Sequence, residues 1–91
     1  MPKGSDKFKH ASNVTWRQVD KDAVILDLDT SNYFSLNEVG VLVWERLGDG
    51  ATIAEVCEEV CKLYDVPPKD ALRDIEKLVA ALSAKKLLVK A

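Results

Sequence analysis

The fold is decided in residues 23–36, which read A-V-I-L-D-L-D-T-S-N-Y-F-S-L. Residues 23–28 are apolar and rich in β-branched side chains, which favours a strand. Residues 29–32 carry short polar side chains that hydrogen-bond their own backbone and therefore favour a turn. Residues 33–36 then resume an extended pattern. Because so short a turn joins antiparallel neighbours, the stretch predicts a hairpin.

A third strand is predicted just upstream of this hairpin. Residues 13–19 read N-V-T-W-R-Q-V, alternate between two faces, and lead into a polar turn. In the strand that follows, the apolar residues Val24, Leu26 and Leu28 alternate strictly. The three strands therefore form a meander, with residues 33–36 at one edge.

Downstream of the strands the apolar residues repeat at helical spacing. Asn37 is a good N-cap for a first helix, which ends at the G-D-G sequence of residues 48–50. A second helix opens with the capping box T-I-A-E at residues 52–55 and runs to about Tyr64. A third helix spans roughly residues 68–84, since proline suits the first turn of a helix.

This order of elements predicts an α+β domain. A three-stranded antiparallel sheet is followed by three helices in a winged-helix-like arrangement. Residues 87–89 form an apolar tail, either a short strand or filler for the core. We expect residues 1–11 to be a flexible N-terminal segment and residues 12–91 to be the folded domain.

The composition argues against several classes of protein. With 47% hydrophobic and 31% charged residues, the 91-residue chain is typical of a globular domain. No apolar run approaches the roughly 20 residues that cross a bilayer, so we expect a soluble, cytoplasmic protein without a membrane partner. The net charge of −2 argues against nucleic acid as a partner, because a binder of this size normally carries a basic face.

The sequence offers no convincing catalytic or metal site. The single histidine, His10, lies in the segment predicted to be flexible, where a base would lack a rigid frame. Cys57 and Cys61 share the apolar face of the second helix, where free cysteine behaves as a small hydrophobe. Two thiolates alone do not complete a tetrahedral site. We therefore expect no catalytic residues, no metal and no cofactor.

The predicted strand 33–36 is the strongest candidate for a binding site. An edge strand leaves backbone amides and carbonyls unpaired, and this one has neither a proline nor an inward lysine to block pairing. An extended peptide could add to such an edge, with backbone hydrogen bonds giving affinity and pockets reading alternate side chains. In the alternative interpretation, the chain's own N-terminus or tail covers the edge.

Two stretches of the chain resemble the PqqD-like family. The first contains the run Y-F-S-L-N-E-V-G-V-L-V-W-E-R-L-G-D-G-A-T at residues 33–52, and the second is Y-D-V-P-P-K-D-A-L-R-D-I-E-K-L-V-A-A-L-S-A-K-K-L-L at residues 64–88. The resemblance covers residues 14–89. Its specific marks are Leu36, Asn37, Gly40, Trp44, Asp49, Gly50, Ala51, Thr52, Asp74, Leu82, Leu87 and Leu88.

The chain departs from the family pattern at two turns. Residues 31–32 are Ser-Asn where a glycine is common, and Lys86 replaces the usual glycine before the final leucines. Both departures affect turns more than a contact surface.

The resemblance implies a RiPP recognition element, where RiPP denotes a ribosomally synthesised and post-translationally modified peptide. Such non-enzymatic elements bind the leader of a precursor peptide as a fourth strand, between the third strand and the third helix. They present it to a modifying enzyme, often a radical-SAM enzyme. Carried over to this chain, the peptide-binding residues are Tyr33, Phe34, Ser35 and Leu36 on the strand and Arg73, Asp74, Ile75, Lys77, Leu78 and Ala81 on the helix. Which flank of the helix lines the groove stays open.

Two other functions stay open as alternatives. A winged-helix DNA-binding regulator would need a basic recognition helix, whereas the third helix balances its basic residues with acidic ones. These residues are Lys69, Arg73 and Lys77 against Asp70, Asp74 and Glu76. A purely structural subunit would dock on an enzyme without touching the peptide. We expect a monomer or a weak homodimer.

Overall fold

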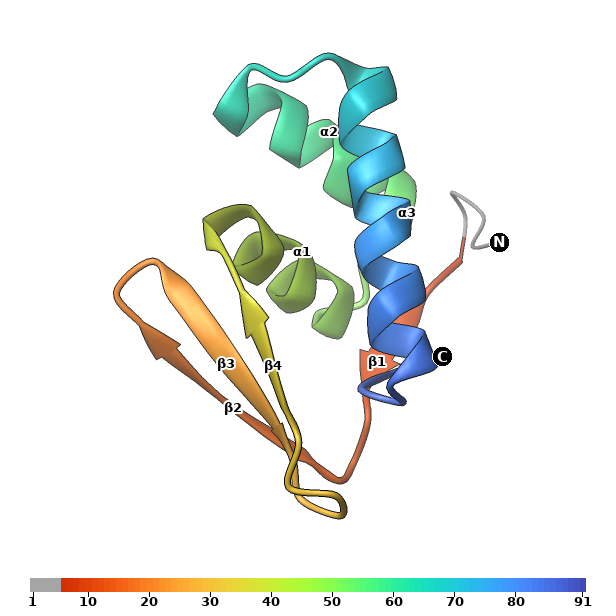
Figure 1. The fold of residues 1–91 in the computed structure, drawn as a ribbon. Helices are drawn as coiled ribbons and strands as arrows, with labels where there is room; N and C mark the ends of the chain where they lie inside the picture. Colours follow the sequence, from red (N-terminus) through yellow and green to blue (C-terminus); the bar gives the residue numbers. More distant parts are fainter. Residues whose placement is uncertain (1–5) are drawn as a thin grey trace.

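The computed structural model describes residues 6–91 and has the predicted α+β fold (Figure 1). Strands β2, β3 and β4 form an antiparallel sheet in that order, and three helices follow it. A further pair of short strands, β1 and β5, joins the two ends of the described chain. The elements are β1 Phe8–His10, β2 Val14–Val19, β3 Asp22–Asp27, β4 Tyr33–Leu36, α1 Glu38–Gly48, α2 Ile53–Tyr64, α3 Pro68–Ala84 and β5 Leu88–Lys90.

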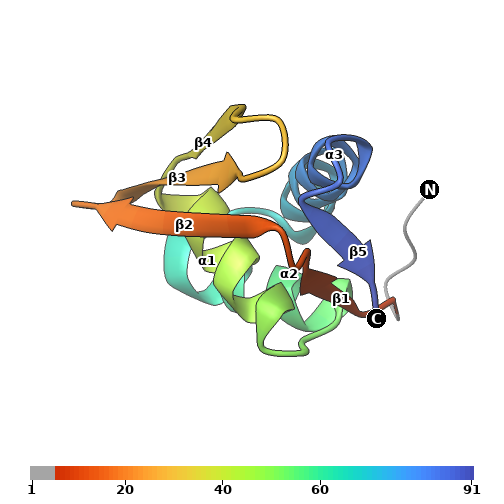
Figure 2. The same ribbon diagram turned by 90° about the horizontal axis from the view of Figure 1, so that it is seen from below.

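One face of the sheet packs on α1, and the other carries no helix or strand of residues 6–91 (Figure 2). On β3 the core face carries Ala23 and Ile25, both buried. The alternating set Val24, Leu26 and Leu28 lies on the outer face, where Leu28 is 58% exposed. Strand β3 is therefore apolar on both faces, although only one of them belongs to the core.

A buried carboxylate fixes the turn that leads into β4. Asp27 is only 7% exposed. Its Oδ1 accepts hydrogen bonds from the backbone amides of Asp29, at 2.9 Å, and Thr30, at 3.3 Å. The side-chain amide of Asn13 donates to the same oxygen at 3.2 Å. These bonds satisfy the carboxylate and hold the start of β4 in place.

Residues predicted as caps open the first two helices. The side chain of Asn37 accepts a hydrogen bond from the amide of Gly40 at 2.9 Å. Thr52 and Glu55 form the predicted capping box: the amide of Glu55 donates to Thr52 Oγ1 at 3.2 Å, and the amide of Thr52 donates to Glu55 Oε1 at 2.8 Å. Pro68 is the first residue of α3, a position at which no intrahelical amide is needed.

The prediction that residues 1–11 form a flexible segment is wrong for those of them that the structure describes. Residues 1–5 lie outside the described part of the chain. Residues 8–10 form β1, which pairs antiparallel with β5, and Phe8 is 7% exposed within the core. The ring of His10 stacks on that of Trp44, with centroids 3.6 Å apart, and its Nε2 donates to the Trp44 carbonyl at 2.8 Å. A three-residue strand whose partner lies near the other end of the chain leaves no periodic signal in the sequence.

The tail serves as both a strand and part of the core. Residues 88–90 form β5, and Leu87 and Leu88 are 3% and 2% exposed. They join a core centred on Trp44, which is fully buried. The rest of this core comes from the apolar faces of the three helices, from β3, and from Phe8 of β1 and Leu36 of β4. Among residues 6–91 there is no helix with the length and apolar character needed to cross a membrane.

Candidate peptide-binding groove

Strand β4 is an edge strand, and no strand of residues 6–91 pairs with its free side. Strands β1 and β5 pair with each other, so within the described chain neither terminus covers this edge. The alternative interpretation, an edge covered by the chain's own ends, is therefore wrong for these residues.

The pairing of β4 with β3 shows which backbone groups are free. The amide of Asp27 donates to the carbonyl of Asn32 at 2.9 Å, immediately before β4 begins. In an antiparallel ladder, hydrogen-bonded and non-hydrogen-bonded pairs alternate along the strand. The register therefore directs the N–H and C=O groups of Tyr33 and Ser35 away from β3. These groups are available to an added strand.

Helix α3 lies across from this open edge (Figures 1 and 2). Its buried stripe packs on α2, and its end is held by β5. The stripe consists of Ala71, Ile75, Val79 and Leu82. A space remains between α3 and β4.

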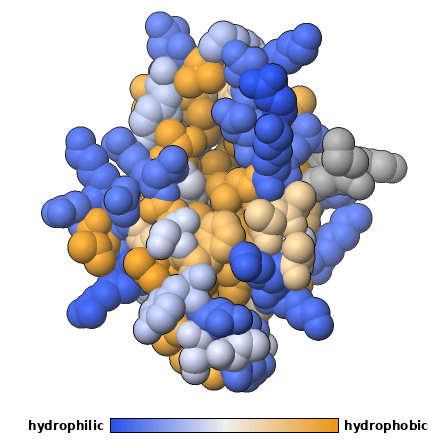
Figure 3. All heavy atoms as spheres, in the orientation of Figure 1, coloured by the Kyte–Doolittle hydropathy of each residue, from blue (hydrophilic) through white to orange (hydrophobic). Residues whose placement is uncertain are grey.

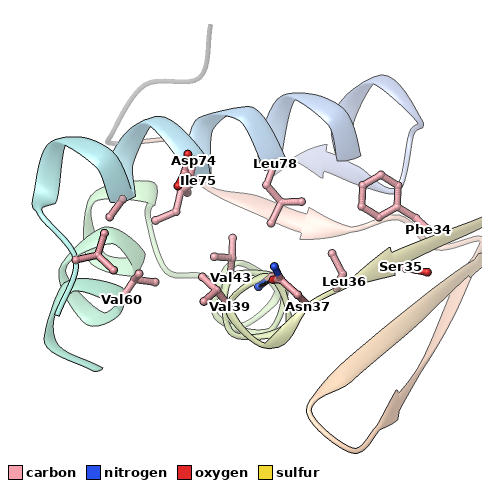
Figure 4. A pocket seen from close by; sticks show the side chains of 13 residues that line it. Phe34, Ser35, Leu36, Asn37, Val39, Val43, Val60, Asp74, Ile75 and Leu78 are labelled. Carbon is pink, nitrogen blue, oxygen red and sulfur yellow. Dashed lines mark hydrogen bonds between the residues drawn. The ribbon is translucent and has the colours of Figure 1, made fainter. Parts of the chain in front are cut away.

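A groove of about 450 Å³ occupies this space. Phe34 and Leu36 of β4 line one side, Ile75 and Leu78 of α3 line the other, and Val43 of α1 contributes to the floor (Figure 4). Figure 3 shows hydrophobic atoms gathered between α3 and β4 on this face of the molecule. A hollow of this size and apolar character can take the side chains of an extended peptide.

The structure brings most of the residues predicted to bind the peptide together in the groove. Those that line it are Phe34, Ser35, Leu36, Asp74, Ile75 and Leu78. Tyr33 lines a smaller hollow at the beginning of β4, and its side chain is 72% exposed. The other three, Arg73, Lys77 and Ala81, are not among the lining residues. Their part in binding stays a prediction, as does that of the lining residues.

The flank of α3 that lines the groove is now defined. Ala71, Asp74, Ile75 and Leu78 face it, at helical spacing along α3. Arg73 lies on another flank, where its guanidinium is 3.4 Å from Asp70 Oδ1. The groove therefore presents an apolar wall with one carboxylate.

Sequence reasoning missed the floor and the far end of the groove. The residues concerned are Asn37, Val39, Gly40, Val43, Val60, Val66 and Ala71. One available signal was Gly40, a glycine inside a helix, where glycine is usually unfavourable. An added Cβ there would lie 3.3 Å from Leu36 Cβ and from Asn37 Oδ1, so glycine allows α1 to approach β4 closely.

The cysteine pair of α2 and the grouping of possible metal ligands bear on the predictions made for catalysis and metal binding. Within the described part of the chain no group of three or more His, Cys, Asp or Glu residues could hold a metal ion. Cys57 and Cys61 are half-buried, and burial, together with the neighbouring Cys61 thiol, raises the pKa of Cys57. A raised pKa disfavours the reactive thiolate. Both cysteines pack against the hydrophobic core, as predicted for small apolar residues.

Comparison with known proteins places the fold among related structures. The family model "Coenzyme PQQ synthesis protein D (PqqD)" matches residues 22–88. TbiB1 in complex with the TbiA(beta) leader peptide is 32% identical, over 88% of this chain and 93% of that one, with a TM-score of 0.82. A lasso peptide synthetase B1 complexed with the leader peptide is 31% identical, over 91% and 98%, with a TM-score of 0.84.

A third structure agrees in fold. It is the solution structure of the PqqD truncation of PqqCD from Methylobacterium extorquens, described as a functional and stand-alone RiPP recognition element. It is 23% identical, over 98% of this chain and 95% of that one, with a TM-score of 0.81. None of the curated protein sequences matches this chain. The family match spans more than half of the chain, so the chain belongs to the PqqD family.

Proposed function

We propose that this protein is a non-catalytic recognition element that binds the leader of a ribosomally made precursor peptide by strand addition. The observation that carries the proposal is the free edge of β4 beside an apolar groove of about 450 Å³. The backbone groups of Tyr33 and Ser35 would pair with the leader, and alternate leader side chains would enter the groove.

The second edge of the sheet explains why β4 is the favoured site. Strand β2 also lies at an edge, and by the same alternation the N–H group of Gln18 points away from β3. No helix flanks that edge (Figure 1). The hollow that β2 lines is shared with Val24, Leu26 and Tyr33, so an added strand at β2 would gain backbone hydrogen bonds but no groove between strand and helix.

The related structures support this function. The structures of two proteins that are 32% and 31% identical in sequence to this chain were solved in complex with leader peptides. By contrast, α3 lacks the basic surplus of a DNA-recognition helix, and two of its charged residues, Arg73 and Asp70, pair with each other at 3.4 Å. We therefore prefer peptide binding to DNA binding, and we place the encounter in the cytoplasm, where precursor peptides are made.

Amide NMR titration with a synthetic leader peptide, taken from the precursor encoded beside this chain's gene, tests the proposal. Shifts should concentrate in β4 and on the groove side of α3, with a Kd in the micromolar range or tighter, about −8 kcal/mol. Shifts spread evenly over the molecule, or none at all, would refute it.

We further propose that a modifying enzyme docks on the outer face of the sheet. Apolar side chains stand exposed there: Val19, Leu28 and Tyr33 are 55%, 58% and 72% exposed. An added leader strand would place every second side chain on this same face, so the enzyme would meet protein and leader together. A radical-SAM enzyme is one candidate partner, but the lasso peptide neighbour favours an enzyme of lasso peptide synthesis.

Replacing Leu28 with aspartate tests this docking face. Leu28→Asp should retain leader affinity but lower the capture of the enzyme encoded beside the gene by about tenfold, since it puts a charge into an apolar contact. The matched control is Leu63→Asp, on α2, where the leucine is 62% exposed. Equal capture by both variants would place the docking surface elsewhere.

A further inference from the structure

Opposite charges lie at the groove and at a smaller hollow near the beginning of β4. Among the residues that line the main groove, Asp74 is the one with a charged side chain. Its carboxylate is 3.9 Å from Arg73 Nε, and both side chains are largely exposed. Arg73 lies closer to Asp70, at 3.4 Å. The contact with Arg73 therefore compensates the charge of Asp74 only weakly.

A lysine lies at the second hollow. A smaller hollow of about 110 Å³ lies where β4 begins, and Tyr33 and Lys85 are among its lining residues. Asp27 also lines it, but its Oδ1 already accepts three hydrogen bonds from the turn and from Asn13. Lys85 is exposed and supplies the positive charge at this end.

The direction of the elements sets the order of these charges along β4. Helix α3 runs opposite to β4, so that Asp74 lies toward the Leu36 end and Leu78 lies between Asp74 and Phe34 (Figure 4). From Asp74 to Lys85 the helix rises about 16 Å, at roughly 1.5 Å per residue. A strand covers that length with about five residues, at roughly 3.4 Å each.

We infer that the bound leader segment carries a basic and an acidic residue about four to six positions apart, on either side of an apolar stretch. The basic residue lies beside Asp74 and the acidic residue beside Lys85. This charge register rests on the proposed leader binding and adds to it, because backbone pairing alone accepts several registers. The two charges would select one register and one strand direction.

A peptide display selection tests the charge register. The probe is a library of synthetic 14-residue peptides (about the length of the groove with its flanks), with apolar residues at alternate positions and Lys, Glu or Gln elsewhere. Wild-type protein should enrich peptides with Lys and Glu in one order at this spacing. The charge-reversed variant Asp74→Lys/Lys85→Glu, which keeps the net charge, should enrich the reverse order.

The matched control reverses a charge pair away from the groove. Glu58 and Lys62 on α2 pair at 3.5 Å and are 71% and 74% exposed, so Glu58→Lys/Lys62→Glu should select as wild type does. In fluorescence anisotropy the wild type should prefer its own order about three- to tenfold, as expected for two exposed pairs. This preference should shrink as salt screens the charges.

The outcomes separate the two proposals. If peptides bind at the groove without a preferred order, or if the preference survives charge reversal, the charge register is wrong while leader binding stands. If no peptide binds and the natural leader causes no shifts in β4, both are wrong. A thermal melt of each variant shows whether its fold is intact. The single variant Asp74→Lys, at an exposed site, should already abolish the preference for one order of charges.

Discussion

Lys86 occupies a backbone position that suits glycine. Its φ is 60°, in the left-handed region. The amide of Lys86 donates to the Ser83 carbonyl at 3.0 Å, and the amide of Leu87 donates to the Leu82 carbonyl at 2.9 Å. This is the hydrogen-bond pattern of a Schellman motif, in which glycine is preferred at the left-handed residue. The departure from the family pattern at this turn therefore leaves the turn itself intact and costs stability.

Replacing this lysine with glycine should stabilise the protein. Lys86→Gly removes the cost of a left-handed side-chain residue, partly offset by the larger entropy of unfolded glycine, for a net gain of about 0.5–1 kcal/mol. The control is Lys85→Gly, where φ is −87° and glycine should destabilise. Denaturant unfolding measures both. A loss of stability in Lys86→Gly would contradict the assigned strain.

The capping box of α2 contributes to folding stability in a way that depends on pH. Hydrogen bonds from the backbone amide and the side chain of Thr52 lower the pKa of Glu55 from its ordinary value. Because the folded pKa is the lower one, Glu55 stabilises the fold at pH values above the ordinary glutamate pKa of about 4.3. This contribution is lost as the pH falls through the folded pKa.

Comparing Glu55→Gln with the wild type isolates this effect. Glutamine can keep the capping hydrogen bond but has no charge. The variant should be less stable at neutral pH, and the difference in free energy of unfolding should shrink over the acidic range that begins at the ordinary glutamate pKa of about 4.3 and extends below the folded pKa. A difference that is the same at both ends of this range would show that the charge of Glu55 contributes nothing.

Elements with a strong local signal could be predicted from the sequence. Asn37 and Thr52 cap helices through their own side chains, which can be recognised in the sequence. The alternation of residues 23–28 indicates a strand whatever its position in the fold. Strand β1 could not be predicted, because its partner, β5, lies at the other end of the chain and pairing of three residues depends on the assembled core.

The candidate site, too, could be predicted from the sequence only in part. Strand β4 could be recognised as an open edge from its place in a three-strand meander. The groove residues Val43 and Val60 could not be separated from the core, since a buried stripe and a groove lining share the same helical period. Only the distance between α3 and β4 distinguishes them, and that distance is set by packing elsewhere.

At the scale of the molecule, α3 borders the groove while its main contacts are with α2 and β5. Its first turns pack on α2, and its last turn leads into β5, which pairs with β1. Phe8 and His10 on β1 anchor this pair to the core beside Trp44. The fold therefore places an open β-edge and an apolar helix face on either side of one groove.

Two proline variants at the two sheet edges test the central claim most directly. In Ser35→Pro the outward amide of β4 is lost, while the hydrogen bonds between β4 and β3 are retained, and Gln18→Pro makes the same change on β2. Both variants should fold, as judged by far-ultraviolet circular dichroism and thermal melting. The measurement is the affinity of each variant for the leader peptide used in the NMR titration. We predict that Ser35→Pro weakens binding at least tenfold and that Gln18→Pro leaves it unchanged; unchanged binding by a folded Ser35→Pro variant would contradict strand addition at β4.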